Sequence, residues 1–215
     1  MVGAHPRGET VSSRDTVLSS VRSAISGAVA PHVARTYHTR LDRGRQALID
    51  LFVERVEDYR ADVRVVRRSE LARTIGAVLA EQGASSVVVP DHLDPEWLTT
   101  VTCSVVRDDP PLTARQLDEI SAVVTSSAVA VALTGTIVLD AGGTQGRRAI
   151  SLIPDLHVCV VDADQVVGTV PEALSWLAPT RPLTWISGPS ATSDIELDRV
   201  EGVHGPRTLV VLLVL

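Results

Sequence analysis

The sequence contains no lysine and no asparagine, and all 20 of its basic residues are arginine. A Walker-type phosphate loop needs a lysine, Schiff-base and pyridoxal-phosphate enzymes need a nucleophilic lysine, and protein kinases need both missing residue types. These four classes are therefore excluded for the chain acting alone. Aromatic residues make up only 3% of the sequence, so the core must be aliphatic and base-stacking platforms for single-stranded nucleic acid are scarce.

Cysteine is equally rare. Cys103 and Cys159 lie far apart, each inside an apolar run, and two thiols cannot hold a four-cysteine iron–sulfur cluster. The histidines show no metal-ligand spacing, so we expect this chain to bind no metal and no cofactor by itself. Reduced, buried thiols are typical of a cytoplasmic protein. The polar N-terminus does not look like a signal peptide, and no apolar run is long enough to span a bilayer, so we expect a cytoplasmic protein without a membrane partner.

The net charge of −6 is unevenly distributed. Residues 1–68 hold 12 arginines and 8 acidic residues, a balance of +4, whereas residues 69–215 hold 8 arginines and 18 acidic residues, a balance of −10. The basic N-terminal part could pack on the acidic body or on a partner protein. Nucleic acid is not an expected partner, because the acidic body would repel phosphates.

The order of the predicted elements indicates the fold class. Strands and helices alternate from residue 63 onward, which favours a three-layer α/β fold with a parallel sheet. We expect an N-terminal tail and helical arm over residues 1–60 and an α/β domain over residues 61–215. Predicted strands cover residues 63–67, 86–89, 101–106, 122–125, 137–139, 156–161, 183–186 and 208–215, and residues 129–133 fit either a strand or a short helix.

One stretch, residues 183–207, gathers reactive side chains after a buried strand. Ser193 and Glu196 have the spacing of a capping box, which predicts a short helix that ends before Gly202. Because ligands of open α/β sheets bind at the carboxyl ends of strands, we expect a site here. Its candidates are His204 and Glu196 for acid–base or nucleophilic chemistry, with Ser190, Thr192 and Asp194 for ligand binding. The alternative is a pair of well-built turns without a ligand.

A second candidate is the loop Gly142–Arg148, which combines three glycines with two arginines. Glycines let backbone N–H groups approach an anion, and arginine binds phosphate or carboxylate with two hydrogen bonds. Arg148 is therefore a candidate contact for a small anionic ligand. No helix pattern follows this loop, so it is not a dinucleotide-binding motif, and it could equally be a hairpin with solvated arginines.

Three segments resemble the lactate utilization protein C family, a group of stand-alone LUD domains. They are Ala132–Leu139, Arg148–Pro154 with His157–Val161, and Ser187–Glu196 with Gly202–Arg207. The resemblance covers residues 120–215 best. It implies a fold similar to the sugar-phosphate isomerase and CoA-transferase group, and it adds Thr134, Gly135 and Thr136 to the expected ligand site. Two positions depart from the family pattern: Leu133 replaces an acidic residue and Ala191 a basic one. These departures imply either a different ligand or weaker binding of the same ligand.

The resemblance also implies a function. The chain would take part in oxidising L-lactate to pyruvate with other lactate utilization subunits, at least one of which carries an iron–sulfur cluster. The chain itself would be the subunit without a cluster. The alternative, by analogy of fold alone, is a stand-alone enzyme or binding protein for a CoA thioester or a sugar phosphate.

Overall fold

The computed structural model describes residues 12–29, 31–34, 37–192, 200–201 and 205–215. The chain divides into two units, Met1–Tyr37 and His38–Leu215. The first contains helix α1 (Ser13–Ala24), whose N-terminus is capped by the Ser12 side chain and none of whose residues is buried. No helix in the described ranges has the length and apolarity needed to cross a membrane.

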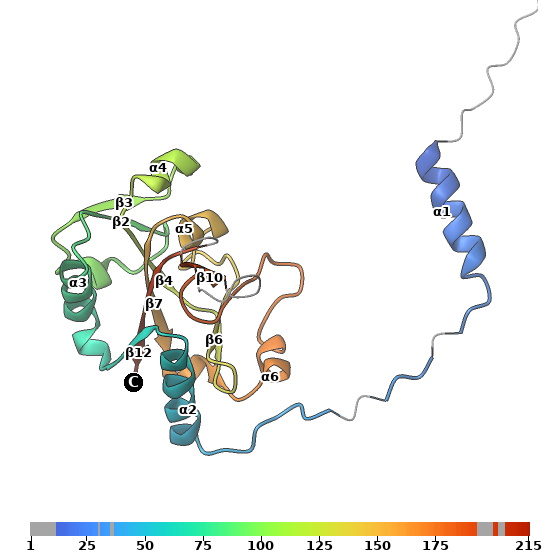
Figure 1. Cartoon of the computed structure of the whole chain (residues 1–215), viewed down its shortest axis with the longest axis horizontal. Helices are drawn as coiled ribbons and strands as arrows, with labels where there is room; N and C mark the ends of the chain where they lie inside the picture. Colours follow the sequence, from blue (N-terminus) through green and yellow to red (C-terminus); the bar gives the residue numbers. More distant parts are fainter. Residues whose placement is uncertain (1–11, 30, 35–36, 193–199, 202–204) are drawn as a thin grey trace, which may run out of the picture. The chain divides into compact units, whose positions relative to one another are not determined.

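Six described strands of the second unit form a parallel sheet in the order β1-β12-β7-β4-β2-β3 (Figure 1). Their bounds are β1 (Asp62–Val66), β2 (Ser86–Val89), β3 (Ser104–Arg107), β4 (Ala122–Ser126), β7 (Leu156–Asp162) and β12 (Thr208–Val214). The last strand along the chain, β12, lies inside the sheet, and six of its seven residues are buried. Continuous Val and Leu runs are typical of strands covered on both faces.

Alternate residues of the central strands serve two different cores, because successive side chains point to opposite faces. Val210 and Leu212 face helix α3 (Leu71–Glu81), which buries Leu71, Ile75 and Leu79 against them. Val211 and Leu213 face helix α2 (Arg45–Asp58) and a second sheet. The fold is therefore a three-layer α/β arrangement, and the predicted fold class with a central parallel sheet is confirmed. The likeness to the isomerase and CoA-transferase group stays a prediction.

Helix α2 belongs to the core of the second unit. Phe52 and Val56 are fully buried, and they pack with Val211 and Leu213 of the sheet. The sequence grouped this helix with an N-terminal arm ending near residue 60, whereas the division of the structure falls between Tyr37 and His38.

The second sheet has the order β8-β5-β6-β9. It consists of β5 (Val129–Val131), β6 (Thr136–Leu139), β8 (Val166–Val167) and β9 (Thr184–Ile186), with β6 antiparallel to both neighbours. Residues 129–131, for which strand and helix were both open, form a strand. The expectation that residues 183–186 join the parallel sheet is wrong, because β9 pairs with β6 through Ile137–Ile186 and its neighbours.

Short helices connect these elements: α4 (Ala114–Asp118), α5 (Arg148–Leu152), α6 (Val170–Leu174) and the single turns Arg68–Glu70, Pro95–Leu98 and Ala163–Gln165. Helix α4 begins with a capping box formed by Thr113 and Gln116. The expectation that no helix follows the glycine loop is wrong, since α5 begins at Arg148. Val200–Glu201 (β11) pairs with Ala191–Thr192 (β10) in an antiparallel hairpin, so the helix predicted up to Gly202 does not include residues 200–201, and its Ser193–Glu196 capping box lies outside the described residues.

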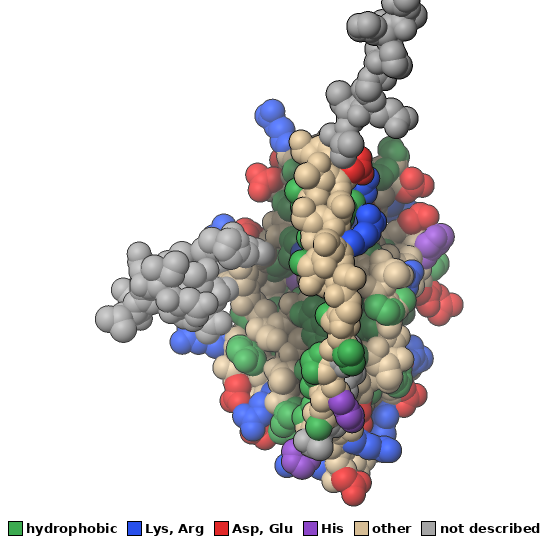
Figure 2. Space-filling view, turned by 90° about the vertical axis from the view of Figure 1, so that its right-hand side faces the viewer, with side chains coloured by type: hydrophobic (Ala, Val, Ile, Leu, Met, Phe, Trp, Pro, Cys, Tyr) green, Lys and Arg blue, Asp and Glu red, His purple; other side chains and the backbone are tan. Residues whose placement is uncertain are grey.

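Charge on the displayed face is mixed. Figure 2 shows acidic and basic side chains interspersed over this face.

Candidate functional site

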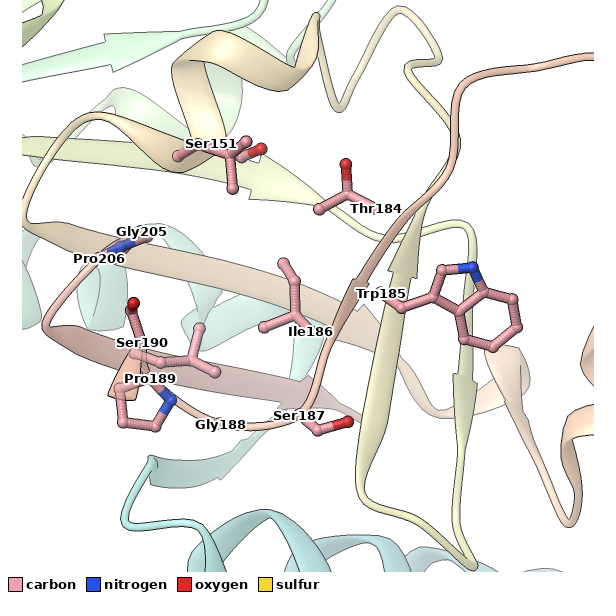
Figure 3. Close-up of a pocket in the computed structure, with 12 residues that line it drawn as sticks. Ser151, Thr184, Trp185, Ile186, Ser187, Gly188, Pro189, Ser190, Gly205 and Pro206 are labelled. Carbon is pink, nitrogen blue, oxygen red and sulfur yellow. The ribbon is translucent and has the colours of Figure 1, made fainter. Parts of the chain in front are cut away.

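A pocket of about 230 Å³ lies between helix α5, strand β9 with its following loop, and the beginning of β12 (Figure 3). Its lining comprises Ser151, Leu152, Thr184, Trp185, Ile186, Ser187, Gly188, Pro189, Ser190, Gly205, Pro206 and Leu209. The pocket is at the carboxyl end of β9, as expected, but this strand belongs to the second sheet. With respect to the parallel sheet the pocket lies at the amino end of β12, because Leu209 is the second residue of that strand.

The loop after β9 is shaped by close backbone packing. Gly188 has a φ of +84°, and a Cβ at this position would lie 2.5 Å from the Cβ of Tyr59, so no larger residue fits without displacement. Farther along the loop, the backbone N–H of Ser190 donates a 2.8 Å hydrogen bond to the carbonyl oxygen of Pro206. Figure 3 shows the Ser190 hydroxyl pointing toward the Gly205–Pro206 loop. The turns Gly188-Pro189 and Gly205-Pro206 thus form one wall of the pocket.

Helix α5 contributes the opposite wall. Ser151 is 2% exposed, and its hydroxyl donates to the carbonyl oxygen of Arg148 at 3.1 Å. The start of the helix is fixed by Arg147, which forms two hydrogen bonds of 2.6 and 2.8 Å with Asp108 and a third with the carbonyl of Leu112. Burial raises the pKa of Asp108, but the hydrogen bonds from Arg147 and from the Leu112 N–H outweigh it, so the pKa lies below its ordinary value.

Arg148 is the first residue of α5 and is exposed. Three other arginines form ion pairs with carboxylates: Arg147 with Asp108, Arg181 with Asp140 and Arg207 with Asp155. Arg148 forms no ion pair within the described ranges. It precedes Ser151 and Leu152 by three and four residues and therefore shares their face of the helix. This placement keeps Arg148 as a candidate for contact with an anionic ligand.

The predicted residues Thr134, Gly135 and Thr136 lie behind the pocket wall. The Thr136 hydroxyl is 2.8 Å from that of Ser187 and 2.7 Å from that of Thr134. Gly135 has a φ of +57°, and a Cβ there would lie 2.7 Å from the backbone of Arg55 in α2. Thr134 lines a separate cavity with Arg55, Asp58, Tyr59 and Leu133. The structure brings this turn to the site, but as support for Ser187 and not as pocket lining.

The glycine loop binds a carboxylate of its own chain. The Gly142 N–H donates to Asp140 at 3.0 Å, and the Asp140 N–H donates to the side-chain oxygen of Gln145 at 2.5 Å. Asp140 in turn forms an ion pair with Arg181 at 2.5 Å. The Gly142 N–H thus contacts an internal aspartate, and Arg148 is the arginine of this loop that forms no ion pair in the described structure. The anion contact of the loop stays a prediction.

Other predicted residues lie outside the described part of the chain. Asp194, Glu196 and His204 are not described, and for Thr192 only its backbone in β10 is described. Their predicted catalytic and binding roles stay predictions. The described residues Ser190 and Gly205, one on each side of this segment, both line the pocket.

Sequence reasoning missed Ser151, Thr184 and Leu209 as lining residues. The sequence did not predict Ser151 as a lining residue, because a helix of five residues is too short to show a helical period. Thr184 and Leu209 lie in apolar runs that predict core strands, and only the packing of β9 beside β12 brings them to one cavity. Ser151 could have been found as a polar residue inside the apolar segment Ala149–Ile153.

A buried polar cluster lies in the parallel sheet. The ring of His157, 1% exposed, is 2.8 Å from the Thr125 hydroxyl, which also contacts the sulfur of Cys159 at 3.8 Å. Burial lowers the pKa of His157 to about 4 and raises the pKa of Cys159 to about 12. His157 is thus neutral and Cys159 a thiol near neutral pH. No three described His, Cys, Asp or Glu residues are grouped so that they could hold a metal ion.

The described lining of the pocket is uncharged. Hydroxyl groups of Ser151, Thr184 and Ser190 lie beside apolar side chains of Leu152, Ile186 and Leu209. Such a lining binds a small molecule through hydrogen bonds and apolar contact. A polyphosphate would need several cations, which the described lining does not provide.

Comparison with known proteins identifies the group to which these features belong. Residues 49–214 match the LUD domain family. The chain is 45% identical over 209 residues to a lactate utilization protein C of Deinococcus radiodurans, covering 95% of this chain and 97% of that protein. It is 28% identical over 170 residues to a lactate utilization protein C of Geobacillus kaustophilus, covering 68% of this chain and 69% of that protein.

A solved structure shows the same fold. The crystal structure of a DUF162 family protein from Deinococcus radiodurans superposes with a TM-score of 0.70 at 43% sequence identity. The match covers 80% of this chain and 99% of that protein. The pocket lies within the matched family region, since its lining residues run from Ser151 to Leu209.

Proposed function

Because the chain belongs to the LUD domain family, we propose that it is the lactate utilization protein C-like subunit of a cytoplasmic complex that oxidises L-lactate to pyruvate. The similarity to curated lactate utilization proteins supports a role in lactate utilization. In this proposal an iron–sulfur partner supplies the electron acceptor for the two electrons removed from lactate. The chain's own part is to hold the small organic acid.

The observation that carries this proposal is the hydroxyl-lined pocket in a chain so similar to lactate utilization proteins. Its volume of about 230 Å³ suits a molecule of a few heavy atoms. Ser151, Thr184 and Ser190 can hydrogen-bond the hydroxyl and carboxylate of such an acid. Arg148, unpaired in the described structure and on the Ser151 face of α5, is the proposed counter-ion of the carboxylate.

The thiols support this division of labour between the chain and its proposed partner. Thiolates are the ligands of iron–sulfur clusters, but burial raises the pKa of both Cys103 and Cys159, which disfavours the thiolate form. Two cysteines are in any case too few for a four-cysteine cluster. The cluster is therefore assigned to a partner subunit.

The alternative ligands, a CoA thioester or a sugar phosphate, fit this pocket less well than a small organic acid does. Both are larger than L-lactate, and a CoA thioester carries several phosphate groups, for which Arg148 would supply only one cation. A pocket of this volume also leaves little space for a nucleotide. We therefore favour the small organic acid.

The test is purification of the tagged full-length chain from its own host grown on L-lactate. The eluate should contain a cysteine-rich partner and reduce a dye when L-lactate is added, whereas the chain purified alone should not. An eluate with neither partner nor activity would contradict the proposed function.

Pocket variants connect the activity to the site. Ser151→Ala with Arg148→Gln should lower the L-lactate-dependent rate of the purified complex at least tenfold. Ser104→Ala with Arg115→Gln is the matched control, since both side chains are exposed on other elements. Equal rates for the two double variants would remove the pocket from the proposal.

A further inference from the structure

An exposed apolar surface covers the outer face of the second sheet. We define this tryptophan face by four residues: Val170 and Leu174 on α6, Trp176 just after it, and Trp185 on β9. Their exposed fractions are 36%, 54%, 56% and 39%. The chain has only three tryptophans, and two of them, Trp176 and Trp185, are exposed to water.

These residues lie on one side of the sheet. Trp185 pairs in register with Val138 of β6, and cross-strand partners point to the same face. Val138 packs with Ala173 and Leu177 of the α6 segment in a small core cluster. Trp185 is therefore on the face that α6 covers, and the short α6 leaves part of that face exposed.

The segment that forms this face is nearly free of charge. Between Gln165 and Trp185 only Glu172 and Arg181 are charged, although charged residues make up 21% of the chain. Each of them forms an ion pair within the second unit. Glu172 lies 3.8 Å from Arg40, and Arg181 lies 2.5 Å from Asp140.

We propose that the tryptophan face is a two-fold interface with a second copy of this chain. In a two-fold interface the same patch meets itself, so any unpaired charge would face a like charge. The tryptophan face avoids this repulsion, whereas the exposed face of α2, with Asp50, Glu54 and Glu57, does not. Tryptophan is also the residue type most enriched at the energetic centre of interfaces.

The interface leaves the pocket open. Trp185 is itself among the residues that line the pocket, but in Figure 3 its ring points away from Ile186 and Ser190. Thr184 and Ile186, its neighbours on β9, line the pocket from the opposite face of the strand. Strand β9 would thus carry the ligand on one face and the second copy on the other.

The test is the mass of the full-length chain in solution as a function of concentration, by light scattering after size exclusion. The wild type should have twice the monomer mass of 22.9 kDa at tens of micromolar. Trp176→Glu and Leu174→Glu should each weaken dimerisation about 30-fold, as expected for a residue at an energetic centre. Val105→Glu is the control, because Val105 is 41% exposed on β3 and lies outside the tryptophan face.

Each outcome decides the proposal. A wild type that is monomeric at 100 µM overturns the proposal. If, in that case, the variants also lose a copurifying partner protein, the tryptophan face is assigned to that partner instead. Dimers that persist in both variants overturn it by placing the interface elsewhere. A monomer from Trp176→Glu with unchanged thermal unfolding, beside a dimer from Val105→Glu, supports it.

Discussion

The hydroxyl of Thr136 lies 2.8 Å from the hydroxyl of Ser187, although the two residues are 51 positions apart. This hydrogen bond joins the first residue of β6 to the loop after β9, at the back of the pocket wall. Both loops also pack on the last turn of α2, through Gly135 against Arg55 and Gly188 against Tyr59. The position of the Ser187–Ser190 wall thus depends on the second sheet and on helix α2 together.

Replacing Thr136 tests this link. Thr136→Val keeps the shape but removes the hydroxyl that bridges Thr134 and Ser187, so the free energy of unfolding should fall by about 1 kcal/mol. Thr136→Ser keeps the hydroxyl and should retain the ligand affinity of the wild type. Urea unfolding measures the first effect, and calorimetric titration with L-lactate the second. If the Val and Ser variants bind L-lactate equally, the hydrogen bond does not position the wall.

Gly135 should tolerate no side chain. Gly135→Ala forces alanine into a φ of +57° and places its Cβ within 2.7 Å of the Arg55 backbone, which should cost about 3 kcal/mol or more. Gly83→Ala is the control, because Gly83 also has a positive φ, +66°, but faces open space. It should cost only about 1 kcal/mol. Equal losses in chemical unfolding would mean that the turn does not press against α2.

The Arg147–Asp108 ion pair should contribute to stability in a pH-dependent way. The carboxylate of Asp108 has a 7% exposed side chain, so Arg147→Gln should lower the free energy of unfolding at pH 7 by about 3 kcal/mol. Because the pKa of Asp108 is lowered in the fold, this stabilisation is present above the ordinary value of 3.8 and is lost as the pH falls through the folded value. Wild type and variant should therefore converge in urea unfolding near pH 2. Arg115→Gln, in an exposed pair with Glu119, should leave stability unchanged at every pH.

Much of the fold could be predicted from local sequence. The capping box at Thr113, the buried strand at Ser86–Val89 and the C-terminal strand each have a signal contained within a few residues. Strand β9 was placed in the wrong sheet because its three residues carry no information on which neighbour they pair with. Helix α5 was missed because five residues are too few to show a helical period.

The candidate site was predictable only in part. Ser190 is a predicted ligand contact because it follows a buried strand, and in the structure it lines the pocket together with Gly205 and Pro206. The ligand contact predicted for Thr136 stays a prediction; in the structure its hydroxyl contacts that of Ser187. Local patterns cannot distinguish a residue that faces a cavity from one that supports its wall, since the difference depends on contacts between distant segments.

His157 should give the folded chain a measurable pH dependence above the range where carboxylates titrate. Burial lowers its pKa from 6.5 to about 4, so the unfolded chain binds more protons between these values. The stabilisation from the neutral ring is complete above pH 6.5 and falls as the pH drops toward 4, by about 3 kcal/mol in total. His157→Gln keeps a polar partner for Thr125 but does not titrate. The difference in free energy of unfolding between wild type and variant, measured with urea from pH 7.5 to 4, should therefore change steadily in favour of the variant as the pH falls. A difference that stays constant over this range would show that His157 is not held neutral by burial.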